Sequence, residues 1–264
     1  MWDTLIVSPF INAILFIYSL VGNFGIAIIL FTILIRLLTH PLMVSQIKST
    51  KIMQDMQKDE KWLKIQEKYK NDKEKLAQEQ MAYYKEIGYS PFSSCLPTLI
   101  QFPIIIGLYQ SIVQSITHTP TELFRLTQHL YAGVFDISKL LPLNAHFLWM
   151  DLGKADWVNI GLPFEIPVLA IIVVVTTYIQ NRLIQPSSGT NDQAAMMGNM
   201  MNIYMPLLMG SMALTLASGL SLYFVVANVI GILQYAALGR VNWRNILPQP
   251  KTNKPVVTNK GQKK

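Results

Sequence analysis

One stretch of the sequence, residues 24–42, is almost wholly apolar and long enough to cross a lipid bilayer, yet it contains an arginine. A guanidinium group stays protonated in proteins. Its transfer into hydrocarbon costs about 2.5 to 17 kcal/mol, depending on how far the side chain can reach toward the headgroups. Arg36 lies six residues before the end of the stretch, or about 9 Å along a helix. It therefore either snorkels to the headgroups or faces a wet recess, and this stretch alone leaves both alternatives open.

The composition is that of an integral membrane protein. Hydrophobic residues make up 51% of the 264 residues and charged residues only 14%, against about 25% charged residues in soluble domains. The first ten residues contain Asp3, no basic residue and no small-residue cleavage site, so we expect no cleavable signal peptide. The single cysteine, Cys95, excludes an intrachain disulfide.

Five apolar segments predict an all-α polytopic membrane protein with five transmembrane helices. We place the spans at residues 23–42, 92–115, 163–184, 201–217 and 220–238. Residues 1–22 are predicted to form an interfacial segment before a bend, although one long tilted helix that continues into the first span is an alternative, since glycine is tolerated in membrane helices. Only Ser218-Gly219 separates the last two spans, which predicts a tight antiparallel hairpin.

The segment of residues 43–90 differs sharply from the spans, because it holds ten lysines and eight acidic residues. Apolar positions recur in it at helical spacing, in the stripes Ile52 and Met56, then Trp62, Ile65 and Tyr69, then Leu76, Gln80, Tyr83 and Ile87. Asn71-Asp72 between the last two stripes is a turn signal. We therefore predict a helical hairpin outside the membrane, with paired apolar seams and charged outer faces.

The other connections are polar. Residues 116–162 contain a capping box with proline at the first helical position, Thr119-Pro120-Thr121-Glu122, which predicts a short helix up to Leu130. Residues 185–200 form a short polar loop. Residues 239–264 form a basic tail with seven lysines and arginines and three prolines, which we expect to be disordered.

The distribution of basic residues predicts the orientation. The hairpin, the 182–199 loop and the tail carry ten, one and seven lysines and arginines, whereas the N-terminus has none and the 117–162 connection has three. Five spans place the first three of these segments on the same side of the membrane. The positive-inside rule then places the N-terminus outside and the hairpin and C-terminus in the cytoplasm.

Polar side chains from all five predicted spans lie at the depth of Arg36. They are Thr32 on the same span, Thr98 and Gln101 on the second, Thr176, Thr177, Gln180 and Asn181 on the third, Asn199 and Asn202 on the fourth, and Asn228 and Gln234 on the fifth. A snorkelling arginine does not require such partners, so this pattern favours an inner-leaflet hydrophilic groove open to the cytoplasm. The pattern is a bias, since Gln110, Gln114, Ser211 and Thr215 are polar on the outer side, and each such residue alone is also typical of helix–helix packing.

Several function classes lack their usual residues. The predicted spans contain no Asp or Glu apart from Glu165 at the outer edge of the third, which argues against a transporter coupled to protons or sodium. The four histidines are scattered, and the sequence contains no Walker motif, nucleophile elbow or paired carboxylates. We therefore predict a non-enzyme without metal or cofactor. Seven methionines between residues 196 and 212 suit either an adaptable client surface or ordinary packing.

Three segments resemble the YidC-type membrane protein insertases, a family that includes the mitochondrial oxidase-assembly and chloroplast Albino-type relatives. They are FTILIRLLTHPL at residues 31–42, KEKLAQEQMAYYKEIGYSPFSSCLPTLIQFPIIIGLYQSI at 73–112 and SGLSLYFVVANVIGILQ at 218–234. The arginine, the hairpin, the proline-rich second span and the Gly-Leu-x-Leu-Tyr motif occur in the family's order.

The resemblance implies an insertase that works without ATP hydrolysis through a cytoplasm-open groove in a bacterial plasma membrane. Arg36 would be the groove arginine, Thr32 a substrate contact, and Gln101 part of the family's Gln-x-Pro. Tyr223 and Phe224 would be the aromatic pair of the last span, although Phe224 carries no hydroxyl. We add Gln180 and Asn228 as candidate substrate-binding residues, because they lie at the same depth.

The implied partners are nascent membrane proteins and the lipid bilayer. The ribosome, through the basic tail and hairpin, and the Sec translocon are candidate partners as well; the ribosome contact would rest on nonspecific electrostatics. A small-solute channel or transporter with a polar mid-membrane site is the alternative function. The missing intramembrane acid and the large charged hairpin favour the insertase.

Overall fold

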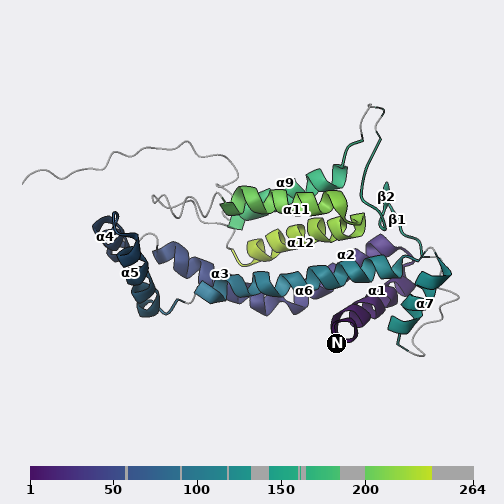
Figure 1. Cartoon of the computed structure of the whole chain (residues 1–264), viewed down its shortest axis with the longest axis horizontal. Helices are drawn as coiled ribbons and strands as arrows, with labels where there is room; N and C mark the ends of the chain where they lie inside the picture. Colours follow the sequence, from purple (N-terminus) through teal and green to yellow (C-terminus); the bar gives the residue numbers. More distant parts are fainter. Residues whose placement is uncertain are drawn as a thin grey trace, which may run out of the picture.

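The structure is a computed structural model, and its described part is mostly helical with one two-stranded sheet. It describes residues 1–56, 59–89, 91–117, 119–131, 143–159, 161, 165–184 and 200–239. Along the longest axis, a pair of charged helices lies at one end, and the N-terminal helices with the small sheet lie at the other (Figure 1).

The chain begins with two helical segments that a sharp bend separates. The π-helix η1 (Asp3–Val7) continues into α1 (Ser8–Val21), and Gly22 ends α1 in the left-handed conformation with φ 69°. The Asn23 side chain then accepts a hydrogen bond from the backbone N–H of Ile26 and caps α2 (Phe24–Leu38). The predicted bend is confirmed, and the alternative of one long helix is wrong.

A further helix lies between the first predicted span and the predicted charged hairpin. A second helix, α3 (His40–Met56), follows α2 after a bend of 57°. Pro41 has no backbone N–H and cannot continue the hydrogen-bond ladder of α2, so the helix axis turns here. The predicted boundary between residues 42 and 43 therefore falls inside α3, and the helical pair begins only at residue 60.

The charged helices α4 (Glu60–Lys68) and α5 (Lys73–Glu86) pack against each other. Asp72 caps α5, as the Asn71-Asp72 turn signal predicts. Trp62 and Tyr83 stack with ring centroids 5.8 Å apart and are buried together with Met56. The predicted apolar seam thus exists, while its cytoplasmic location stays a prediction.

The next helices are α6 (Pro91–Ser115) and α7 (Pro120–His129). In α7, the Thr119 side chain accepts from the Glu122 N–H and the Glu122 side chain accepts from the Thr119 N–H, so the predicted capping box is confirmed. Two short antiparallel strands follow, β1 (His146–Phe147) and β2 (Met150–Asp151).

The last three helices are α9 (Val168–Ile184), α11 (Met205–Thr215), which the π-helix η2 (Met200–Tyr204) precedes, and α12 (Ser218–Ala237). The helix α9 begins five residues after Pro163, where we placed the start of the third span, because residues around Ile166 are extended and pair with Val158. Ser218 and Gly219 belong to α12 itself.

The predicted tight hairpin of the last two spans is wrong in its packing. The chain does reverse between α11 and α12, but both helices pack far more extensively against α9 than against each other. In Figure 1, α9, α11 and α12 lie on one side of the bundle, and α2 and α6 lie on the other. The helix α12 contacts α9, α2 and α6, so it lies at the centre of the bundle.

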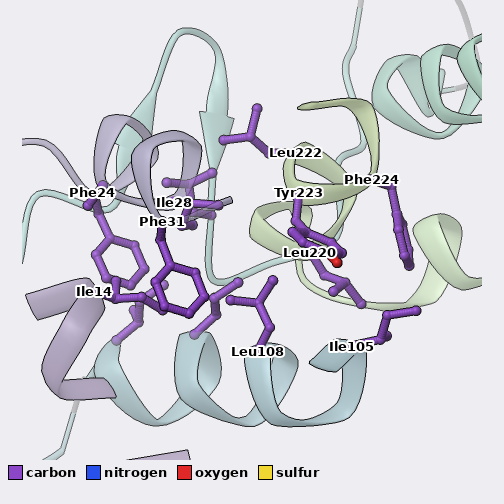
Figure 2. Close-up of a cluster of buried hydrophobic side chains, with 14 of the residues drawn as sticks. Ile14, Phe24, Ile28, Phe31, Ile105, Leu108, Leu220, Leu222, Tyr223 and Phe224 are labelled. Carbon is purple, nitrogen blue, oxygen red and sulfur yellow. The ribbon is translucent and has the colours of Figure 1, made fainter. Parts of the chain in front are cut away.

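The main core lies between α1, α2, α6 and α12. Phe31 and Phe10 meet edge to face at 5.2 Å, and Ile28, Leu108 and Ile112 are fully buried. Figure 2 shows Ile14 of α1, Phe31 of α2, Leu108 of α6 and Leu220 of α12 in this cluster. This core positions α12 against α2, which brings the polar residues of both helices together.

By length and composition, two stretches of the described chain can cross a membrane, Asp3–Val21 and Ser218–Ala237. A third does so if Phe24–Leu38 and His40–Ser49 count as one bent span. Leu99–Ser115 and Val168–Ile184 are apolar but shorter. The count of five spans and the interfacial position of residues 1–22 stay predictions.

Candidate functional site

Arg36 lies in the last turn of α2. Its side chain is partly exposed, but its Nε atom is buried and has no hydrogen-bond partner among the described residues. No ion pair of Arg36 forms within the described part of the chain. The hydroxyls of Tyr223 and Tyr235 on α12 are close enough to interact electrostatically with the guanidinium.

The direction of the helices around Arg36 affects the stability of its positive charge. The helices α2, α9 and α12 all begin near the small sheet (Figure 1), and the last turn of α12 reaches Arg36 through Gln234. The C-terminus of a helix carries a partial negative charge of about half an elementary charge. The C-terminal end of α2, where Arg36 lies, therefore favours its cation, and no carboxylate pairs with it in the described part of the chain.

Gln234 on α12 holds the main chain at Arg36. Its Nε2 atom donates to the carbonyl oxygen of Arg36 at 3.2 Å, and the same atom lies 3.4 Å from Nδ1 of His40. The α2 ladder ends at this bend, where the hydroxyl of the C-cap residue Thr39 also lies 3.4 Å from the Arg36 carbonyl oxygen. Gln234 thus connects α12 to the junction of α2 and α3.

Gln101 on α6 reaches the same place from a third helix. Its side-chain Nε2 donates to the hydroxyl of Tyr223, which is 1% exposed. Figure 2 shows Tyr223 pointing away from α12 into the space between α12 and α6. We call Arg36, Gln101, Tyr223, Gln234 and Tyr235 the arginine cluster.

Asn228 and Gln180 form a second polar contact, between α12 and α9. The Asn228 Nδ2 atom lies 2.8 Å from the hydroxyl of Thr177 and 3.1 Å from that of Thr176. Gln180 packs so closely on Gly231 that a Cβ there would lie 2.5 Å from its amide nitrogen. These residues join two helices and are not in hydrogen-bond contact with Arg36.

Four predicted site residues are buried, Thr32, Tyr223, Phe224 and Asn228, and two of them, Thr32 and Phe224, make no hydrogen bond to another helix among the described residues. Thr32 is 0% exposed, and its hydroxyl donates to the carbonyl oxygen of Ile28 in its own helix. Phe224 is 6% exposed and belongs to the apolar core, with its ring 5.7 Å from that of Tyr223. A direct client contact at either residue would require the helices to move apart.

Sequence reasoning noted Gln234 only as a polar residue of the last span and missed Tyr235. One signal could have found Tyr235, because it lies seven residues after Asn228 and therefore on the same face of α12. Among the polar residues predicted at this depth, Asn199 and the side chain of Thr98 lie outside the described residues. Within the described ranges, no group of His, Cys, Asp and Glu could hold a metal ion.

The opposite end of the bundle is closed by residues 143–159, which we call the loop end. Its backbone carbonyls accept the first N–H groups of two helices, Asn144 from Phe24 of α2, and Lys154 and Leu152 from Ser218 and Gly219 of α12. The buried carboxylate of Asp156 accepts from the Leu169 N–H of α9 at 2.7 Å and from the Trp149 indole. Three helix starts are therefore capped by one segment.

Comparison with known proteins gives a consistent set of similarities. The model of the family described as 60Kd inner membrane protein matches residues 16–244. The chain is 36% identical to the membrane protein insertase MisCA of Bacillus subtilis, over 88% of this chain and 77% of that protein. It is 34% identical to the membrane protein insertase YidC 2 of Bacillus anthracis, over 88% of this chain and 79% of that protein.

A solved structure is also similar, the crystal structure of an active YidC insertase with its first transmembrane domain resolved. It matches with a TM-score of 0.53 at 27% identity, over 86% of this chain and 46% of that chain. The YidC insertase of Syntrophus aciditrophicus is 35% identical over 88% of this chain, which spans only 36% of that protein. Our chain thus spans less than half of these two longer proteins.

Proposed function

The chain belongs to the 60Kd inner membrane protein family, and we propose that it inserts membrane proteins through a hydrophilic groove at the arginine cluster, without ATP hydrolysis. The relatives of this membrane-protein family are named membrane protein insertases, and the family is not one of enzymes. Nascent membrane proteins and the lipid bilayer are the partners that this membership implies. The groove, its opening to the cytoplasm and its energy source are our proposal.

One observation carries the proposal. Arg36 is a partly exposed cation at the end of an apolar helix, without a carboxylate partner in the described part of the chain. A purely structural cation in such a position would be expected to have an ion partner, since unpaired charges in membranes are costly. An unpaired arginine beside neutral hydrogen-bonding groups can bind the polar segment of a client for a short time.

In the mechanism that we propose, a short hydrophilic segment of a client enters beside Arg36. Neutral donors and acceptors from α2, α6 and α12 replace part of the water that the segment loses, and acidic client residues are attracted to the guanidinium. The client's apolar helix then partitions into the bilayer, which supplies the driving force. The sequence contains no Walker motif, in agreement with transfer that needs no nucleotide.

The loop end supports a groove that opens on one side only. Capped helix starts and the buried carboxylate of Asp156 close the bundle where α2, α9 and α12 begin. With the N-terminus outside, as the charge distribution predicts, this closed end faces away from the cytoplasm and the arginine cluster faces toward it. The α4–α5 pair would guide clients, and ribosome and Sec contacts belong to the same proposal.

Photo-crosslinking from three positions tests the proposal. A photoreactive amino acid at Gln101, which is partly exposed, should crosslink to a stalled nascent client, and one at Thr32 or Phe224 should do so only during insertion, because both are buried at rest. The control position is Val229, which is 45% exposed on α12 and should crosslink mainly to lipid.

The same purified protein in nucleotide-free proteoliposomes should protect a client segment from added protease. Absence of crosslinks at all three positions, together with solute flux through these proteoliposomes, would favour the channel alternative and overturn the insertase proposal.

A further inference from the structure

Two atoms of the arginine cluster are buried and have no hydrogen-bond partner among the described residues, Nε of Arg36 and Oε1 of Gln234. The first can only donate a hydrogen bond and the second can only accept one. The two residues are neighbours across α2 and α12, since the Gln234 side chain bonds to the main-chain carbonyl of Arg36. The closed site therefore holds one unpartnered donor and one unpartnered acceptor, which a ligand reaches only when the helices around them move apart.

The orientation of the Gln234 amide follows from its neighbours. The carbonyl oxygen of Arg36 can only accept, so the atom of Gln234 that lies 3.2 Å from it must be the NH₂ group. Nδ1 of His40, 3.4 Å from the same nitrogen, is a second acceptor in the tautomer that carries its proton on Nε2. These contacts hold the NH₂ group and leave Oε1 as a preoriented acceptor.

The chemistry of the two free atoms selects among ligands. A carboxylate or a lipid phosphate offers only acceptors and would leave the Gln234 oxygen unsatisfied. A main-chain peptide group offers a C=O acceptor and an N–H donor within one short segment, and it therefore satisfies both atoms. An unsatisfied buried acceptor is costly, so this difference affects binding directly.

We propose that Arg36 and Gln234 together bind a main-chain peptide group of the client's hydrophilic segment. This inference rests on the proposed function and specifies what the site recognises. Arg36 Nε donates to a client carbonyl, and Gln234 Oε1 accepts from a client N–H. Every polypeptide carries these groups, so the site accepts clients of different side-chain sequence, and the charge of Arg36 adds a preference for acidic segments.

Two matched variants isolate the amide of Gln234. Gln234→Met removes the acceptor together with the NH₂ group that bonds to the Arg36 carbonyl, and keeps approximately the shape and volume of the side chain. Gln114→Met is the control, because the Gln114 oxygen is also buried without a partner among the described residues, but it lies at the other end of α6, away from Arg36. Thermal unfolding in detergent shows whether each variant is folded before its activity is compared.

The clients are two single-span proteins that differ only in the translocated segment, one neutral and one with two aspartates. We expect Gln234→Met to reduce insertion of both clients about fivefold in proteoliposomes, and Gln114→Met to change neither. Arg36→Lys, which keeps the charge without the Nε donor, should impair the neutral client more than the acidic one. A loss in Gln234→Met that is confined to the acidic client would overturn the inference.

A change in the client alone avoids any question of folding. Amide-to-ester substitution at successive positions of the neutral segment removes one main-chain N–H at a time. At one or two positions the ester should lower insertion by the unaltered protein and have no effect with Gln234→Met. If the esters lower insertion equally with the unaltered protein and with Gln234→Met, the Gln234 oxygen accepts from water and not from the client, and the inference fails. If the unaltered protein inserts neither client, the proposed function itself fails.

Discussion

The two ends of the bundle differ in whether their buried polar groups have hydrogen-bond partners. At the loop end, backbone carbonyls and the Asp156 carboxylate meet the N–H groups at the starts of α2, α9 and α12. In the arginine cluster, Arg36 and Gln234 keep buried atoms without partners in the described chain. The capping groups of the loop end are thus used within the fold, whereas the proposed client contact would use the free atoms of the arginine cluster.

The contrast has exceptions. Gln114, Ser115 and Ser221 also have buried side-chain atoms without a partner among the described residues, and they lie toward the loop end. None of them carries a charge, and each belongs to a helix that is otherwise packed. The contrast between the ends therefore rests on charge and on helix capping, and mutations at each end test it.

The largest effect on stability is expected from Asp156→Ala. The substitution leaves the Leu169 N–H and the Trp149 indole without their acceptor inside the protein, at a cost of about 2–3 kcal/mol. The unfolding midpoint in detergent should fall clearly, and Asp156→Asn, which keeps an acceptor, should recover part of the loss. An unchanged midpoint would show that the loop end does not hold the helix starts.

Arg36→Ala should instead lower insertion activity without lowering stability. We expect insertion of clients with charged translocated segments to fall about tenfold, which corresponds to about 1.4 kcal/mol, and Arg36→Lys to retain much of the activity. The unfolding midpoint should stay equal or rise, because the substitution removes a partly buried cation that has no carboxylate partner in the described chain. A large drop in stability would assign Arg36 to the fold instead of the function.

Asn228→Ala should have an intermediate effect. It removes the amide that joins α12 to Thr176 and Thr177 of α9, and hydrogen bonds between membrane helices contribute about 0.6 kcal/mol on average. The midpoint should fall slightly, and neutral and acidic clients should be inserted equally well relative to each other. A change in client preference would instead place Asn228 among the client contacts.

The smallest effect is a dependence on pH at the loop end. Partial burial acts to raise the pKa of Asp151, but hydrogen bonds from the Lys154 side chain and the Gly153 N–H outweigh it, so the pKa lies below its ordinary value. A lowered folded-state pKa contributes stability above the unfolded pKa of about 3.9, and this is lost as the pH falls through the folded pKa.

Unfolding midpoints measured between about pH 6 and pH 3 should therefore fall less steeply for Asp151→Asn than for the unaltered protein. Because Lys154 is largely exposed, the difference should be small. Identical slopes would show that Asp151 contributes nothing to the loop end.

Local signals in the sequence predict local structure well here. The capping box at Thr119 and Glu122, the bend at Gly22-Asn23 and the stacked seam of Trp62 and Tyr83 all depend on residues within a few positions or on one helical period. Each was predictable because the hydrogen bond or contact forms between near neighbours or across a short turn.

The packing partners were harder to predict. The contact of α11 with α9 rather than α12 depends on side-chain fit, for instance at Gly210, where a Cβ would lie 2.4 Å from Val174. The short connection between α11 and α12 predicts that the chain reverses, but not which helix each of them packs against. The continuation of α3 to Met56 was missed because the composition changes at residue 43 while the helix does not end there.

For the candidate site, the sequence predicts which polar residues share a depth with Arg36, but not which residues each of them touches. The sequence places Thr32, Gln101 and Asn228 at the level of Arg36, but only Gln101 joins the arginine cluster, through Tyr223. Thr32 faces into the core and Asn228 faces α9. Which face of each helix meets α2 depends on the rotation of the helix in the bundle, which depth alone does not determine.

The 57° bend between α2 and α3 makes α3 a lever arm. At 1.5 Å per residue, the 17 residues of α3 extend for about 25 Å, so a change of about 10° in the bend moves the far end by about 4 Å. The pivot lies at Thr39, next to the Arg36 carbonyl that Gln234 holds. Such a change would have to break the contacts of α3 with α6 and of Met43 and Ile47 with Tyr235, so these contacts fix how far the α4–α5 pair lies from the arginine.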